Sequence, residues 1–200
     1  SSMLLFPNVF TKQRMIEDYN LTNLFTGLSY TAEYPRNLVF HEHEKTIAIK
    51  KRYGSEKLEM IAYMPTWRGL TSTALEIAGY AEELKKILQV LDETLNDDQM
   101  LYVNLHSLVK DVIPIQGYQH ICSFPEGVDN YEFLMGCDML ITDYSSVLFD
   151  FALTKRPVIL FVYDAEEYAR DRGMYFSVQD LPFVKAETLK QLQEYITKQK

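Results

Sequence analysis

The chain has 200 residues, of which 47 % are hydrophobic and 13 % aromatic, which suits one globular domain or one half of a two-domain enzyme. Its 20 Lys and Arg residues against 28 Asp and Glu give a formal net charge of −8, which excludes a broad nucleic-acid surface but allows a small phosphate site. With only two cysteines and no apolar run near the ~20 residues of a membrane span, the composition favours a cytosolic protein.

The opening part of the chain carries little strand pattern. Tyr-Pro-Arg-Asn at 34–37 predicts a loop before a helix over roughly 42–53. We therefore expect residues 1–40 to be a connecting segment from a missing N-terminal domain, and residues 41–200 to form one domain. His41 and His43 resemble a metal pair, but residues two apart on a helix point in different directions, so we reject that site.

Short apolar runs alternate with helical patterns from residue 59 onward. Thr73 and Glu76 form a capping-box pattern, and apolar residues then recur at steps of three and four up to Leu95, which predicts a long amphipathic helix. Shorter helices are predicted over 130–136 and 145–154, and a last one near Leu189–Ile196. Strands are predicted at 59–65, 99–106, 138–142 and 157–163, with one or two more from 111–115 and 120–124.

Strands separated by helices predict an α/β fold, with a Rossmann-like parallel sheet flanked by helices. In such sheets the ligand lies at the carboxyl ends of the strands. The stretch "CDMLITDYSSVLFDFALTKRPVILFVYD", residues 137–164, places a polar loop at such an end.

The polar loop at 142–146 favours phosphate binding. A helix starting near Ser145 would present free backbone N–H groups, and the hydroxyls of Thr142, Ser145 and Ser146 would add donors. Asp143 cannot face a bare phosphate, so we expect it to turn away and cap backbone, or to meet a hydroxyl or a cation. The alternative is that Ser145 is an ordinary N-cap in a polar loop.

Two further strand ends carry polar side chains. Thr66 and Arg68 follow the strand at 59–65 with Trp67 between them, so that Arg68 can fork onto a phosphate and Trp67 can pack beneath. His106 ends the next strand. Each alone is more typical of a structural residue, but parallel strands would bring all three ends to one edge of the sheet.

Other segments give weaker indications. The stretch 170–176 offers two arginines beside a glycine, either as anion donors or as a solvated charge run. Cys122 and Cys137 lack a Cys-x-x-Cys spacing and are predicted to be core residues.

Taken together, "YPRN", "YMPTWRG", "LHSLV", the 137–164 stretch and "RGMYF" resemble the CDP-glycerol glycerophosphotransferase family of teichoic acid polymerases and primases, in order and spacing over most of residues 30–183. The resemblance implies the C-terminal, donor-binding half of a GT-B fold. It also implies transfer of glycerol phosphate or ribitol phosphate from a CDP-activated donor to a lipid-linked polymer, with release of CMP. No cofactor beyond that donor is implied, and the whole enzyme would lie on the inner face of the cell membrane.

The resemblance also assigns roles to residues. Thr142, Ser145 and Ser146 would hold the donor phosphates, while Arg68 and the catalytic His106 would lend positive charge. Further donor contacts would come from Arg36, Thr66, Asp143, Asp150, Arg172 and Gly173.

The chain departs from the family pattern in several places. The usual Leu-His-Pro is Leu105-His106-Ser107, and the Trp-His-Gly motif that would supply a general base is absent. The family's Gly before Tyr-Pro-Arg-Asn is Glu33, and the Asp that often follows is Leu38. We therefore expect this chain to bind donor without transferring it. Two alternatives stay open: a GT-B enzyme that uses a nucleotide sugar, and a non-catalytic nucleotide-binding or interaction module.

Overall fold

The computed structural model describes residues 3–42, 44–53, 55–69, 71 and 73–198. Its contacts divide the chain into two compact units, Ser1–Glu42 and His43–Lys200. His43, one member of the rejected metal pair, lies outside the described residues.

The smaller unit contains more regular structure than the sequence predicts. β1 (Met3–Phe6) and β2 (Leu28–Thr31) pair in parallel, joined through α1 (Val9–Asp18) and α2 (Leu21–Leu24). The expectation of little strand in this region is wrong, because strands of four residues are too short to show a period-two pattern. The predicted loop at 34–37 begins a 3₁₀ helix, η1 (Pro35–His41).

The larger unit is built on one six-stranded sheet in the order β5-β4-β3-β6-β7-β8. Every pairing in this sheet is parallel. The strands are β3 (Glu59–Met64), β4 (Gln99–Val103), β5 (Ile121–Ser123), β6 (Met139–Thr142), β7 (Val158–Phe161) and β8 (Val184–Ala186). The predicted α/β class with a parallel sheet is therefore confirmed.

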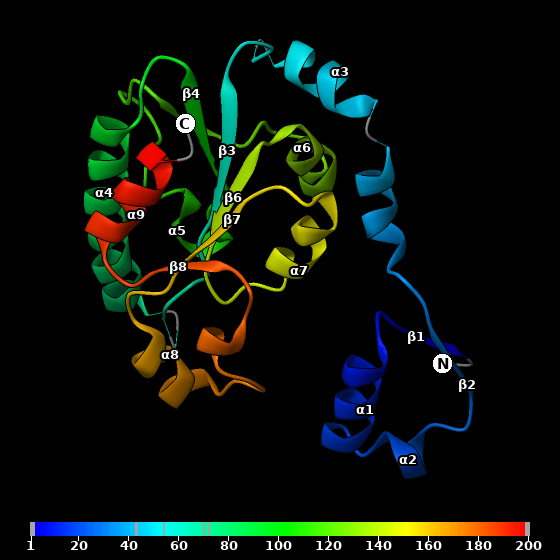
Figure 1. The fold of residues 1–200 in the computed structure, drawn as a ribbon. Coiled ribbons are helices and arrows are strands. Elements are labelled where there is room, and N and C mark those ends of the chain that lie inside the picture. Colours follow the sequence, from blue (N-terminus) through cyan, green and yellow to red (C-terminus); the bar gives the residue numbers. More distant parts are fainter. Residues whose placement is uncertain (1–2, 43, 54, 70, 72, 199–200) are drawn as a thin grey trace. The chain divides into compact units, whose positions relative to one another are not determined.

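Helices cover both faces of this sheet (Figure 1). α4 (Ala74–Thr94) and α9 (Leu189–Lys198) pack together on one face, and α3 (Lys45–Arg52), α6 (Asn130–Gly136) and α7 (Val147–Phe151) lie on the other. The connections add α5 (Ser107–Lys110), η2 (Ala152–Thr154), α8 (Ala165–Arg172) and η3 (Val178–Asp180).

The long helix α4 forms as its sequence predicts. The Thr73 side chain accepts from the Glu76 backbone N–H, and the Glu76 carboxylate accepts in return from the Thr73 N–H, so the capping box is complete. Its apolar stripe is buried against the sheet through Leu84, Leu88 and Leu91. Packing of this apolar stripe against the sheet provides most of the stability of the α4 helix.

Two sequence predictions in this unit are wrong. Residues 111–115 form no strand, although Ile113 is buried, because Pro114 has no N–H to donate to a ladder; β5 comes from the alternative at 120–124. Cys137 is buried as predicted, but Cys122 is exposed beside the Met100 sulfur.

The order of the strands creates a switch point. The chain moves outward from β3 through β4 to β5, and then returns to place β6 on the other side of β3. The crevice between the carboxyl ends of β3 and β6 is where open parallel sheets bind ligands.

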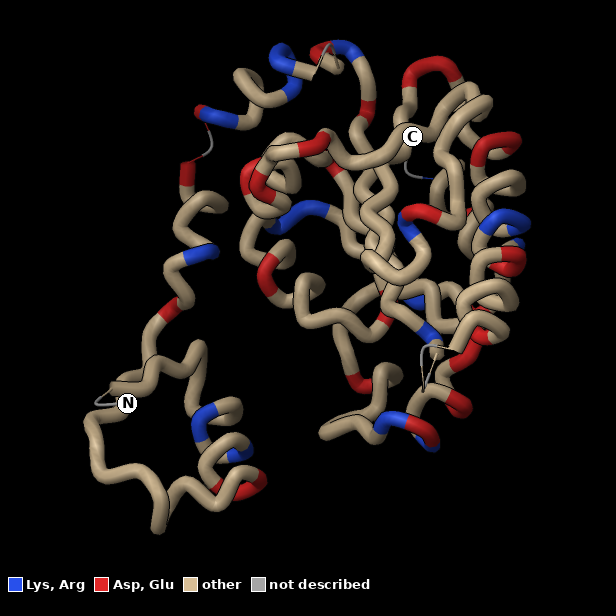
Figure 2. The backbone as a smooth tube through the Cα atoms, turned by 180° about the vertical axis from the view of Figure 1, so that it is seen from behind, with Lys and Arg blue, Asp and Glu red and all other residues tan. Residues whose placement is uncertain are grey.

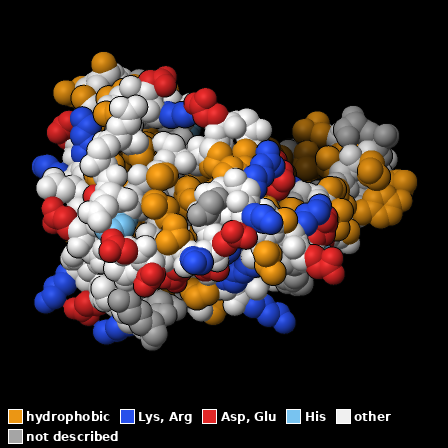
Figure 3. Space-filling model, turned by 90° about the horizontal axis from the view of Figure 1, so that it is seen from above, with side chains coloured by type: hydrophobic (Ala, Val, Ile, Leu, Met, Phe, Trp, Pro, Cys, Tyr) orange, Lys and Arg blue, Asp and Glu red, His pale blue; other side chains and the backbone are white. Residues whose placement is uncertain are grey.

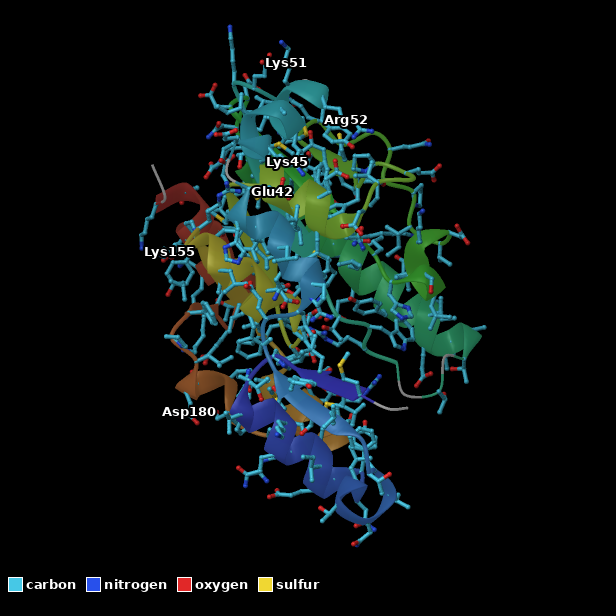
Figure 4. All side chains as sticks on the ribbon, turned by 90° about the vertical axis from the view of Figure 1, so that its right-hand side faces the viewer. Glu42, Lys45, Lys51, Arg52, Lys155 and Asp180 are labelled. Atoms are coloured by element: carbon cyan, nitrogen blue, oxygen red, sulfur yellow. The ribbon has the colours of Figure 1, made fainter. Side chains whose placement is uncertain are left out.

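Charged side chains are mixed over the surface. Acidic and basic positions are both spread over the larger unit (Figure 2), and the face seen from above shows both signs among hydrophobic side chains (Figure 3). Lys51 and Arg52 project from the end of α3 (Figure 4), and Arg52 lies 3.7 Å from Glu132. Because α3 ends just before β3 begins, this basic group lies away from the switch point.

None of the helices among the described residues is long and apolar enough to cross a bilayer.

Candidate functional site

Three strand ends meet around the switch point. Thr66, Trp67 and Arg68 follow β3, His106 follows β4, and residues 143–146 follow β6. Because β3 lies between β4 and β6, the segment after β3 separates the other two.

Trp67 forms the floor between these segments. It is buried, its ring packs edge-on against Tyr80 with centroids 5.3 Å apart, and the His106 ring stacks over it at 6.2 Å. Gly69 makes this packing feasible, since a Cβ at that position would lie 2.0 Å from the indole. Trp67 therefore packs beneath the site, as the sequence predicts.

His106 is exposed at the start of α5. Its Nδ1 accepts from the Leu108 N–H at 3.3 Å, so a neutral ring carries its proton on Nε2. No partner for Nε2 is found within the part of the chain that the structure describes. The ring is thus held by Trp67 and α5 while Nε2 stays available to a ligand.

Asp143 faces inward and binds the segment after β3. Its carboxylate accepts from the Thr66 N–H at 2.9 Å, from the Thr66 hydroxyl at 2.5 Å and from the Tyr144 N–H at 2.6 Å. This is the orientation that the sequence predicts for Asp143. The carboxylate therefore links the end of β6 to the end of β3. Because the Thr66 hydroxyl donates its proton to Asp143, it cannot donate that proton to a ligand at the same time.

Thr142 does not offer its hydroxyl to a ligand. The side chain is fully buried, and Oγ1 donates to the Met64 carbonyl at 2.7 Å. As the last residue of β6 it lies in a strand whose two faces are both covered. The structure thus contradicts the prediction that Thr142 holds a phosphate.

The two serines remain available. Ser146 is exposed, and its hydroxyl makes no hydrogen bond within the described residues. Ser145 is half-buried, and its Oγ accepts from the Val147 N–H at 3.5 Å, which leaves its own proton free to donate. The helix begins at Val147, and the Leu148 and Phe149 amides bond to the carbonyls of residues 145 and 146. The amides of Leu148 and Phe149 are therefore not available to a phosphate as the sequence predicts, and the serine hydroxyls are the side-chain donors left at this helix start.

Arg68 is enclosed where the sequence predicts a free guanidinium. It lies between Asp143, at 2.8 Å, and Asp164, at 2.5 Å. Burial alone would lower its pKa, but the two carboxylates outweigh burial and raise it. Tyr144 also donates its hydroxyl to Asp164 at 2.8 Å, and burial with this bond raises the Tyr144 pKa.

Asp164 is the residue that the sequence argument missed. It directly follows the strand predicted at 157–163, so the rule that selects polar residues after parallel strands would have selected it as well.

Several of the other predicted donor contacts are occupied within the protein. Asp150 is buried and accepts from the Tyr131 hydroxyl at 2.6 Å. The Arg172 guanidinium donates to the Gly69 carbonyl. Gly173 takes φ 70° with ψ 154°, a conformation that requires glycine. Arg36 lies in the smaller unit with its guanidinium 4.5 Å from the Tyr34 ring centre.

Cavities of different character open along this edge of the sheet. One of about 250 Å³ follows β4 and β5 and is lined by both strand-end loops, including Asn104, Lys110 and Glu126. A second, of about 320 Å³, lies between α4, the end of β7 and α8. Its lining of Glu83, Asp164, Glu167 and Asp171 against Arg68 and Arg172 is net acidic, which disfavours phosphate there. Among the described residues no group of three or more His, Cys, Asp or Glu could hold a metal ion.

Comparison with known proteins identifies the family. The model of the CDP-Glycerol:Poly(glycerophosphate) glycerophosphotransferase family matches residues 7–200. The chain belongs to this family. A glycerophosphotransferase relative, the teichoic acid poly(glycerol phosphate) polymerase of Staphylococcus epidermidis, is 35 % identical over 161 residues, which are 74 % of this chain and 22 % of the relative. The polymerase of the same description from Bacillus subtilis is 36 % identical over 187 residues, 88 % of this chain and 24 % of that protein.

A solved structure agrees with this family membership. The wall teichoic acid polymerase TagF, as a histidine-to-asparagine variant soaked with CDPG, superposes with a TM-score of 0.77 at 26 % identity, covering 98 % of this chain and 47 % of that one. The GT-B-like class expected for a glycerophosphotransferase is therefore confirmed. The chain spans less than half the length of each of these relatives.

Proposed function

We propose that this chain is the donor-binding part of an enzyme that transfers glycerol phosphate or ribitol phosphate from a CDP-activated donor to a teichoic-acid-like or capsular polymer. The bond from the donor's β-phosphorus to the bridging oxygen breaks, an acceptor hydroxyl oxygen bonds to that phosphorus, and CMP leaves. Family membership supports this reaction, because relatives are described as teichoic acid polymerases and primases for glycerol phosphate and ribitol phosphate.

The observation that carries the proposal is the set of exposed donors at the switch point. The Ser146 hydroxyl and the His106 Nε2 have no protein partner among the described residues, and the Ser145 proton is available next to Ser146 in the chain. Hydroxyl and imidazole donors at the carboxyl ends of parallel strands suit an anionic diphosphate. In this role His106 would stabilise charge that develops on the departing CMP.

The nucleoside would occupy the cavity after β4 and β5. At about 250 Å³ the cavity is close to the lower end of small-molecule sites, about 300 Å³, which suits one part of a nucleotide rather than a whole donor. Its position beside Leu105, which directly precedes His106, would direct the phosphates toward the serines.

The smaller unit supports a further domain in the whole enzyme. A two-stranded parallel sheet is not stable alone, and parallel sheets are covered on both faces. Here α1 buries none of its residues, and Val9 and Phe10 are exposed. The missing N-terminal domain would complete this unit, supply the general base, and approach the lipid-linked acceptor at the inner face of the membrane.

Calorimetry tests donor binding. CDP-glycerol and CMP should bind the chain, and the double variant Ser145→Ala, Ser146→Ala should lose this binding, while the matched control Ser29→Ala in the smaller unit should keep it. A preference for a UDP-sugar would instead support a nucleotide-sugar transferase, and no binding of any of these ligands would support an interaction module. Robust polymer transfer by this chain alone would contradict the proposed need for another domain.

A further inference from the structure

Three charged side chains form a closed group at the switch point. Arg68 Nη1 lies 2.8 Å from Asp143 Oδ2, and Arg68 Nε lies 2.5 Å from Asp164 Oδ2. The side chains are 13 %, 3 % and 15 % exposed, in the order Arg68, Asp143, Asp164. We name these three residues the charge triad.

The triad is enclosed by tyrosine rings. The guanidinium lies 5.0 Å from the ring centre of Tyr144, and 5.6 Å from those of Tyr163 and Tyr168. Arg68 Nη1 also donates to the Thr66 carbonyl at 2.8 Å, and Nη2 donates to Asp164 at 3.3 Å. Nη1 and Nη2 of Arg68 therefore donate to the protein itself, whereas Nε is buried close to Asp164 without making a hydrogen bond, so a phosphate would have to displace protein partners to reach the guanidinium.

The charges of the triad matter to an anion bound nearby. Two poorly exposed carboxylates, at the end of β6 and the end of β7, would repel a diphosphate. The repulsion is strong because little water lies around these carboxylates to screen their charge. Arg68 forms an ion pair with each carboxylate, and its single positive charge offsets one of their two negative charges. Asp143 in turn fixes the start of the loop that carries Ser145 and Ser146.

We propose that Arg68 is a positioning residue that admits the anionic donor without touching it: it offsets one of the two negative charges of Asp143 and Asp164, and it locks the segments after β3 and β6 together. This inference rests on the proposed function, because it concerns the same site. It also replaces the direct phosphate contact that the sequence predicts for Arg68.

A series of ligands with increasing charge distinguishes a field effect from a contact. Calorimetry should compare cytidine, CMP and CDP on the wild-type chain, on Arg68→Met, and on the triple variant Arg68→Met, Asp143→Asn, Asp164→Asn. For Arg68→Met we expect the loss of affinity to grow with ligand charge, from under about threefold for cytidine to about tenfold or more for CDP. The triple variant carries no triad charge, and the asparagine in place of Asp143 keeps one carbonyl oxygen that can accept from the backbone, so this variant should recover part of the CDP affinity that Arg68→Met loses.

The opposite pattern would overturn the proposal. If Arg68 contacts phosphate, the triple variant remains as weak for CDP as Arg68→Met. If Arg68 has only a structural role, affinity falls equally for cytidine and CDP. Arg68→Lys keeps the charge but loses the fork, so it should retain more CDP affinity than Arg68→Met.

Hydrogen exchange tests the triad without any ligand. The Thr66 and Tyr144 amides donate to Asp143, so their exchange should accelerate in Arg68→Met, where Asp143 loses the ion pair that holds it. Unchanged exchange in Arg68→Met would overturn the positioning role. If the wild-type chain binds no cytidine nucleotide, the proposed function fails, and the exchange result still decides whether the triad holds the loop.

Discussion

Thr142 and Ser146 belong to the same polar stretch of the sequence, but the structure predicts opposite consequences for their substitution. Thr142→Val keeps the shape of the side chain and removes the hydroxyl that donates to the Met64 carbonyl at 2.7 Å. Leaving this part-buried carbonyl without its donor costs about 1–3 kcal/mol. For a unit of this size, a loss of about 2 kcal/mol lowers the melting temperature by roughly 4–8 °C.

Urea denaturation of Thr142→Val should therefore show a lower midpoint with an unchanged slope, while calorimetry shows unchanged CDP affinity. Ser146→Ala is the matched comparison. Its hydroxyl is exposed, so stability should stay within about 0.5 kcal/mol of the wild type while CDP binding weakens. A Thr142→Val protein of full stability that no longer binds CDP would refute this reasoning, since it would mean that the hydroxyl turns outward to the ligand.

Further substitutions and labelling test the surrounding structure. Gly69→Ala would place a Cβ 2.0 Å from the indole of Trp67, the single tryptophan of the chain, so its fluorescence should shift and stability should fall by about 1–3 kcal/mol; an unchanged spectrum would contradict this packing. Burial raises the pKa of the Cys137 thiol strongly and that of Cys122 less, and a raised pKa means less thiolate at neutral pH. Maleimide should thus label exposed Cys122 faster as pH rises and reach Cys137 only in denaturant; two labelled thiols in the native protein would contradict this. Leu88→Ala should cost about 2–5 kcal/mol in urea denaturation, because the side chain is fully buried, and a loss below about 1 kcal/mol would count against the core described.

Elements with a buried apolar face were predictable from the sequence. Most residues of β3 and β6 and one whole stripe of α4 are buried, so the apolar runs, the helical spacing and the capping box can be recognised in the sequence. The missed elements lack such a face. α8 buries none of its residues, and β8 has three residues of which one is buried, so neither leaves a pattern to detect.

The location of the candidate site was predictable, but the direction of its side chains was not. Polar residues after parallel strands mark the edge of the sheet from sequence alone. Whether a hydroxyl points outward depends on where the strand ends: Thr142 is still part of β6, whereas Ser146 lies beyond it. The enclosure of Arg68 depends on Asp164, which is 96 residues away in the chain. A local sequence pattern cannot predict a contact between residues that are so far apart in the chain.

The boundary after Glu42 also bears on how the protein should be prepared for screening. A gene shortened to His43–Lys200 would keep the whole six-stranded sheet and every candidate donor contact except Arg36. It would discard the exposed Val9, Phe10 and Leu24, which invite self-association in a concentrated sample. Such a shortened protein is the natural reagent for fragment soaking and for nuclear magnetic resonance titration.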